Sequence, residues 1–307
     1  MYLYLPVALT SINILVPVGL GLAVGLLSGL FGVGGGFLLT PLLIMFGIPS
    51  TVAAATDSNQ IVAASTSGTY AHWKVGNVDF KMGLYLLVGG FVGGIIGVQA
   101  IKLLHAMGNA DFVIKMTYVL MLGIVGVYMF IESIQSMRKK QSAVDEAKDG
   151  KESAIGRFLK TLPLQTRFEK SGVTHSALVP IVLGSFVGVL AAIMGVGGGF
   201  LMVPVMVYML RMPMHVVVGT SLFQILFTCI EVTFLQAYTN HSVDFLLAVL
   251  LLVGSTVGAQ VGTVFGRKLK GEQLKVLLAV IVLIVTVKIV FELTLTPSLL
   301  ISQAGGH

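Results

Sequence analysis

Charged residues are scarce in this chain, and their scarcity excludes most soluble folds. Only 10% of the 307 residues are Asp, Glu, Lys or Arg, and 56% are hydrophobic, whereas a soluble domain carries about 25% charged residues. Most of the surface must therefore face something other than water. The single cysteine, Cys229, excludes an intrachain disulfide and a cysteine-based metal site.

Long apolar segments are abundant instead, and they predict an all-α, polytopic membrane protein. A spanning helix needs about 20 mostly apolar residues, so this length allows roughly ten spans with short connections. The 37 glycines fit this class, because glycine is commoner in membrane helices than in soluble ones. The apolar segments cover residues 14–31, 37–47, 50–72, 82–104, 112–134, 175–194, 200–211, 214–238, 243–265 and 273–293.

A polar stretch at residues 136–172 separates two groups of five segments. Basic residues outnumber acidic ones there, and such an excess marks cytoplasmic loops. We therefore predict a first transmembrane repeat at 1–135, a cytoplasmic linker at 136–172 that is partly helical or disordered, and a second transmembrane repeat at 173–307. The basic residues behind the net charge of +6 lie mainly in such loops, so nucleic acid is not expected as a partner.

The two groups of segments repeat each other. The sequence GVGGGF occurs at residues 32–37 and again at 195–200, an offset of 163 residues. Further matches follow in the same order at offsets of 164 and 165: Pro49 with Pro213, Thr56 with Thr220, Gln60 with Gln224, Val78-Asp79-Phe80 with Val243-Asp244-Phe245, and Gly89, Gly93 and Gly97 with Gly254, Gly258 and Gly262. Matches in order over four successive segments predict an internal repeat.

The orientation of the repeats depends on whether the short segments, 37–47 and 200–211, cross the membrane. If they cross, each half has an odd number of spans, and the second half is inverted relative to the first. If they re-enter without crossing, the basic cluster at 267–275 falls on the outer side, against the positive-inside rule. We favour two inverted five-helix repeats, each with a short helix that begins at a glycine cluster.

The glycine clusters are the first candidate binding elements. Non-helical backbone at membrane depth is tolerated only where it is buried in protein or lines a wet cavity. Glycine allows positive φ and close approach, and free N–H groups at a helix start favour an anion. Paired broken helices at matching positions point to a transporter's substrate site. The alternative is tight helix packing through small residues.

Polar residues in the third segment of each half are the second group of candidates. They either hydrogen-bond a polar anion or join helices, and the sequence leaves both open. The candidate substrate-binding residues are Gly32, Gly34, Gly35, Gly36, Thr56, Ser58, Asn59, Gln60, Gly195, Gly197, Gly198, Gly199, Thr220, Ser221 and Gln224.

Two acids within apolar segments are candidates for proton coupling. A carboxylate in a span costs several kcal/mol unless it is paired, hydrated or protonated, so Asp57 is a candidate proton carrier. Its alternative role is a structural partner for a basic or backbone group. Glu231 is the other deep acid, and it aligns near Ser67 rather than Asp57. No metal and no cofactor is expected, because no nucleophile–base motif or H-E-x-x-H is present.

These motifs resemble the sulfite exporter TauE/SafE family. The resemblance rests on residues 29–37 with Pro41, on residues 192–200 with Pro204, and on Gly219-Thr220-Ser221. In the first half the last motif is altered to Ala55-Thr56-Asp57, which places a carboxylate where the family pattern has a hydroxyl. The resemblance covers nearly the whole chain except the linker.

The resemblance implies a secondary transporter, not an enzyme, that exports small sulfur-containing anions such as sulfite or organosulfonates like sulfoacetate. We expect proton coupling and alternating access around a central site at the two GVGGG clusters. The alternative is a passive anion channel or uniporter on the same fold. The expected location is a lipid bilayer, the bacterial inner membrane, with the oligomeric state open and a homodimer as one alternative.

Overall fold

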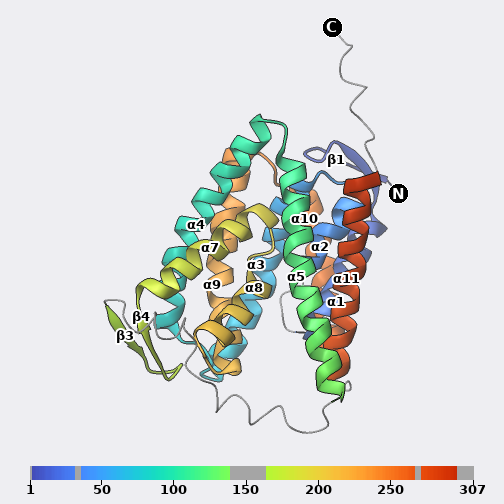
Figure 1. Ribbon diagram of the computed structural model, residues 1–307. Helices are drawn as coiled ribbons and strands as arrows, with labels where there is room; N and C mark the ends of the chain where they lie inside the picture. Colours follow the sequence, from blue (N-terminus) through green and yellow to red (C-terminus); the bar gives the residue numbers. More distant parts are fainter. Residues whose placement is uncertain (1, 32–35, 139–163, 267–270, 296–307) are drawn as a thin grey trace.

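The computed structural model describes residues 2–31, 36–138, 164–266 and 271–295 (Figure 1). Three of the predicted glycines, Gly32, Gly34 and Gly35, lie outside these residues, as does most of the expected linker. The described part contains ten α-helices and two short antiparallel hairpins. An all-α membrane architecture was predicted, and the helical class is confirmed.

The helices follow the predicted apolar segments closely. In the first half they are α1 (Leu15–Phe31), α2 (Gly36–Met45), α3 (Ser50–Lys74), α4 (Phe80–Ala106) and α5 (Ala110–Arg138). In the second half they are α7 (Leu178–Met194), α8 (Gly199–Pro204), α9 (Met214–Leu235), α10 (Phe245–Gly266) and α11 (Gly271–Leu295). Short π-helices, η1 (Val205–Met209) and η2 (Gln236–Asn240), continue α8 and α9. As predicted, α2 and α8 are short and begin at glycines.

Among the described residues, four helical stretches are long and apolar enough to cross a membrane: Phe80–Ala106, Ala110–Tyr128, Val216–Asn240 and Phe245–Gly262. Shorter apolar stretches lie in α1, α2, α7 and α11. Although α3 is 25 residues long, it is absent from this set, and it carries the cluster of polar residues at 56–60. The described helices thus include one long helix whose sequence is too polar for an ordinary lipid-facing span.

Two β-hairpins were not predicted. Strands β1 (Tyr2–Leu5) and β2 (Thr10–Asn13) pair antiparallel, and β3 (Gln165–Phe168) and β4 (Val173–Ser176) do the same. The second hairpin follows the first at the same offset of 163 residues that relates the glycine clusters. It occupies part of the segment that we expected to be linker. The two hairpins lie at opposite ends of the helical bundle (Figure 1).

Helices of one half pack mainly on helices of the other half. The pairs with the most extensive contacts are α1 with α10, α4 with α7, α3 with α9, and α5 with α11. The first two pairs correspond to each other under the repeat, because α1 matches α7 and α4 matches α10. The last two pairs each join a helix to its own counterpart. The helices of the two halves are therefore interleaved in one bundle, and its main contacts follow the repeat seen in the sequence.

Glycines make the α4–α7 and α1–α10 contacts close. A side chain at Gly89 or Gly93 of α4 would run into the backbone of α7 at Ile181 and Ser185. The aligned glycines Gly254 and Gly258 of α10 face the backbone of α1 in the same way. Small residues let two helix backbones approach in a membrane, where van der Waals contact drives association. These glycines serve packing.

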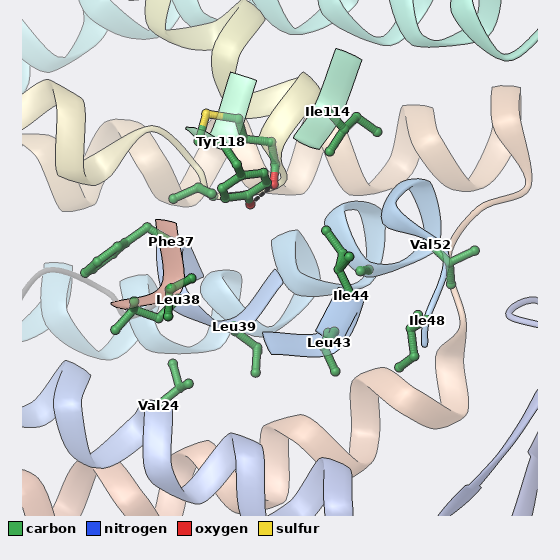
Figure 2. Packing of buried hydrophobic residues seen from close by; sticks show 14 of the residues in the cluster. Val24, Phe37, Leu38, Leu39, Leu43, Ile44, Ile48, Val52, Ile114 and Tyr118 are labelled. Carbon is green, nitrogen blue, oxygen red and sulfur yellow. Dashed lines mark hydrogen bonds between the residues drawn. The ribbon is translucent and has the colours of Figure 1, made fainter. Parts of the chain in front are cut away.

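The largest apolar cluster surrounds α2. Figure 2 shows α2 lying between Tyr118 and Ile114 of α5 on one side and Val24 of α1 on the other. Every residue of α2 from Gly36 to Leu39 is buried. The short helix is therefore enclosed by protein, as a broken helix must be at membrane depth.

Candidate functional site

The two short helices meet at their first turns. Phe37 of α2 and Phe200 of α8 each follow a glycine cluster, and their ring centroids are 5.6 Å apart. Both rings are buried. Because the two phenylalanines are aligned in the repeat, this contact lies where the pseudosymmetry relates the halves. The starts of both broken helices thus come together in the interior.

The second glycine cluster has the irregular backbone that the sequence predicted. Gly195, Gly197 and Gly198 all have positive φ, at 71°, 66° and 73°. Gly195 ends α7 in the left-handed conformation, and Gly199 begins α8. A methyl group placed on Gly195 would run into the backbone of Ala54 in α3. Glycine is required here both for the positive φ and for the close approach to α3.

Side chains of the first half hold the carbonyl groups that are freed where α7 ends. The hydroxyl of Tyr118 in α5 donates to the carbonyl oxygen of Met194. The hydroxyl of Ser58 in α3 donates to the carbonyl oxygen of Gly195 at 3.1 Å and of Ala54 at 3.3 Å. The last carbonyls of a helix have no partner within the helix, so these two hydroxyls satisfy them.

Asp57 lies beside the first turn of α2. Its Oδ2 accepts a hydrogen bond of 2.7 Å from the Thr40 hydroxyl, and a methyl group placed on Gly36 would lie 3.4 Å from the same oxygen. Asp57 is fully buried. Its other oxygen, Oδ1, has no hydrogen-bond partner among the described residues. The carboxyl is therefore only partly satisfied, at the start of the first broken helix.

Two other buried aspartates show what a satisfied carboxylate looks like in this fold. Asp79 caps α4: Oδ1 accepts from the backbone N–H of Met82, and Oδ2 accepts from the N–H and the hydroxyl of Ser171 in the second hairpin. Asp244 caps α10 in the same way, accepting from the N–H groups of Leu247 and Val7. Each aspartate joins its helix to the hairpin of the other half. These two acids are structural.

Comparison with known proteins gives the family. A family model described as "Sulfite exporter TauE/SafE" matches residues 18–289. The chain belongs to the TauE/SafE sulfite exporter family. Its match spans both glycine clusters, both short helices and all four of the helix pairs described above.

Curated relatives have names that agree with this assignment. The chain is 26% identical over 282 residues to the probable membrane transporter protein YunE of Bacillus subtilis (strain 168), covering 89% of this chain and 96% of that protein. It is 26% identical over 272 residues to YjnA of the same organism, covering 88% and 97%. Sulfite exporter TauE/SafE family protein 2 of Arabidopsis thaliana is 32% identical over 96 residues, 31% of this chain and 21% of that protein. No solved structure matches.

In this TauE/SafE protein the predicted threonines join the two halves. The Thr220 hydroxyl oxygen accepts the N–H of Asp79 at 3.0 Å, and the Thr56 hydroxyl oxygen accepts the N–H of Asp244 at 3.1 Å. Each bond links the third helix of one half to the fourth helix of the other. Both threonine oxygens are thus engaged by backbone, so of the two roles that we left open, the contacts favour helix joining.

The remaining predicted polar residues divide between two surroundings. Gln224 donates from Nε2 to Thr228 at 2.9 Å and lies against Gly90 of α4, while Ser221 donates to the carbonyl of Val218. The Oε1 atoms of Gln60 and Gln224 are both buried without a hydrogen-bond partner in the described part of the chain. Asn59 is only partly buried. None of these contacts brings Gln224 or Ser221 to Asp57.

Glu231 lies on α9, apart from the contacts that surround Asp57. It is half-buried and faces Gly94 of α4, with Oε2 unpartnered among the described residues. Its neighbours along the same face of α9 are Gln224 and Thr228, which are spaced at three and four residues. Glu231 therefore continues a polar stripe between α9 and α4.

Two residues around Asp57 were missed by the sequence analysis. Thr40 lies in a short apolar segment just before Pro41, and its isolated hydroxyl at membrane depth was a signal. Tyr118 lies in an ordinary apolar segment, and nothing in the sequence marks it, because its role depends on the carbonyl of Met194 in the other half.

Proposed function

We propose that this protein exports small sulfur-containing anions, such as sulfite or organosulfonates like sulfoacetate, in a proton-coupled cycle of alternating access. The observation that carries the proposal is the meeting of two glycine-initiated helices through Phe37 and Phe200, beside a buried carboxyl, Asp57, that lacks a full set of partners. The family name supports sulfite as the substrate, and organosulfonates are proposed with it as small anions of related chemistry.

Several features support two inverted repeats of five helices. The β1–β2 and β3–β4 hairpins, which match at one offset, lie at opposite ends of the bundle (Figure 1). The helices α5 and α11 lie side by side, and α5 ends at the lower end of the view while α11 ends at the upper end (Figure 1). We propose that the inverted halves move against each other around the contact between α2 and α8.

The proposed substrate site lies at the glycine clusters. Backbone N–H groups near a helix start are free to bind an oxyanion, and positive φ at Gly197 and Gly198 exposes backbone that a side chain would cover. Sulfite and sulfonate groups present three oxygen acceptors, which suits several N–H donors. The predicted glycines, with Ser58 and Gln60 nearby on α3, are the proposed binding residues.

Asp57 links proton and anion occupancy in this proposal. A charged carboxylate beside Gly36 weakens the binding of an anion at the first turn of α2, and protonation removes that repulsion. The described residues bury no lysine, arginine or histidine that would neutralise it. Glu231 is proposed as a second proton-binding group. We also propose that the linker at 136–172 is cytoplasmic, because basic residues outnumber acidic ones there, and that the membrane is the bacterial inner membrane.

Binding of the anion by the purified protein tests the substrate class. A ligand that binds only the folded state stabilises it by RT ln(1 + L/Kd), where L is the ligand concentration, so the melting temperature rises with ligand concentration above Kd. We expect sulfite or sulfoacetate to raise the melting temperature of the detergent-solubilised protein in this concentration-dependent manner, and equal concentrations of chloride to have no effect. Stabilisation by neither sulfur compound would reject this substrate class and leave the fold and the family assignment intact.

A further inference from the structure

The end of α7 depends on side chains that belong to the first half. Met194 is the last residue of α7, and its carbonyl accepts the hydroxyl of Tyr118, which is fully buried. The hydroxyl of Tyr118 also lies beside that of Thr40. Thr40 in turn donates to Asp57. A short chain of hydroxyl groups thus connects the partly satisfied carboxyl with the second helix break.

The Tyr118 phenol has one proton to donate and two possible acceptors. A phenol has a single O–H donor, and Tyr118 can give it to the carbonyl of Met194 or to the oxygen of Thr40. When Asp57 is charged, Thr40 gives its own proton to the carboxylate, which polarises its oxygen into a better acceptor for Tyr118. When Asp57 is protonated, its bond from Thr40 is a weaker, neutral one, and the Met194 carbonyl keeps the phenol proton.

Few titratable groups lie near Asp57 in the described part of the chain. The titratable groups that face it in the described part are Tyr118 of α5 and Cys229 of α9, and α2 contributes only the hydroxyl of Thr40. No buried basic side chain is present among the described residues. A change of charge at Asp57 therefore acts on hydroxyl groups and on the carbonyl end of α7.

We propose that Tyr118 is a positioning residue that links the protonation of Asp57 to the break between α7 and α8. The proposal rests on proton coupling in the proposed function. In the structure Tyr118 holds the carbonyl of Met194 while Oδ2 of Asp57 accepts from Thr40, as the carbonyl oxygen of a protonated carboxyl can. We assign this arrangement to protonated Asp57. Loss of the proton from Asp57 draws the phenol toward Thr40, releases the end of α7 and loosens the second glycine cluster.

The only cysteine of the chain reports on this cluster without engineering. Cys229 is buried, and a methyl group placed on Gly197 would lie 2.6 Å from its Sγ. We would measure the rate of Cys229 alkylation by a small maleimide on the purified full-length protein over a range of pH. Dividing each rate by that of Asp57→Asn at the same pH removes the pH dependence that the thiol reaction has apart from Asp57. A negative charge at Asp57 disfavours a thiolate nearby, so this direct effect lowers the ratio and cannot produce a rise.

The ratio of each alkylation rate to that of Asp57→Asn should depend on pH differently in each variant. The wild-type ratio should be near one at low pH and rise severalfold as the pH is raised. Tyr118→Phe leaves the Met194 carbonyl without its donor, so its ratio should be high at every pH. Thr40→Val breaks the link to Asp57, so its ratio should stay low at every pH. Tyr85→Phe, which removes a phenol in α4 that packs on Phe168, should behave as wild type.

Two results would overturn the proposal. A wild-type ratio that does not change with pH would show that Asp57 does not control the break. A Tyr118→Phe ratio that rises with pH as in the wild type would show that Tyr118 is not the link. The assay contains no substrate, so failure of sulfite or sulfoacetate to bind would count against the proposed substrate alone.

Discussion

Replacement of Asp79 by asparagine should destabilise the protein more than the same replacement of Asp57. In Asp79→Asn the amide nitrogen replaces Oδ2, which accepts the backbone N–H of Ser171 at 3.1 Å. The Ser171 hydroxyl can rotate to accept from the new amide, but the backbone N–H cannot. A buried donor left without an acceptor costs about 1–3 kcal/mol.

Asp57→Asn keeps the hydrogen bond from Thr40. The Thr40 hydroxyl, which donates to Oδ2, can donate to an amide oxygen as well, so the amide can take an orientation that keeps this bond. The amide nitrogen then takes the place of Oδ1, which has no hydrogen-bond partner in the described structure, so one unsatisfied buried polar group replaces another. We therefore expect a smaller change in the free energy of unfolding than for Asp79→Asn, below about 1 kcal/mol.

The two variants can be compared by heating them in the same detergent and following the monodisperse peak by size-exclusion chromatography. A loss of 1–3 kcal/mol corresponds to roughly 2–12 °C in the melting temperature, by the scaling for domains of 150–250 residues. Asp79→Asn should melt lower by such an amount, and Asp57→Asn should melt closer to the wild type. An unchanged Asp79→Asn, or a larger loss in Asp57→Asn, would refute the division into structural and functional aspartates.

Two further predictions concern packing and coupling. Gly93→Ala places a methyl group against the backbone of Ser185 and should sharply lower the yield of folded protein. Gly19→Ala, with nothing within 4 Å of the new methyl group, should express normally. Equal yields of the two variants in fluorescence-detected size-exclusion chromatography would contradict the packing role. Asp57→Asn should remove the pH dependence of anion flux in proteoliposomes while flux itself remains measurable, and a wild-type pH profile would exclude Asp57 as the proton carrier.

Much of the helical architecture could be predicted from the sequence, because hydropathy alone marks segments that must satisfy their backbone within a helix. The short helices α2 and α8 were also predicted, since GVGGGF occurs twice and cannot continue a helix easily. The two hairpins were not. The strand Gln165–Phe168 has no apolar run, the strand Tyr2–Leu5 is only four residues long, and only an offset of 163 residues relates the two hairpins.

The candidate site was predicted in outline and differs in its contacts. Asp57 stood out because it is an acid in an apolar segment. Thr56 and Thr220 were candidates either for substrate binding or for joining helices, and both accept backbone N–H groups from the opposite half. Such a bond joins residues 141 or 188 positions apart, and no local pattern reveals it. Tyr118 was missed for the same reason.

Transport itself is the central claim, and uptake of sulfur-labelled sulfite and sulfoacetate into inside-out vesicles tests it most directly. Export then appears as uptake, measured with and without a protonophore. The proposed mechanism predicts accumulation above the external concentration that collapses when the protonophore is added. Uptake that only equilibrates and is unaffected by the protonophore would contradict proton coupling and indicate a channel or uniporter. Absence of uptake of both anions would contradict the proposed substrate class.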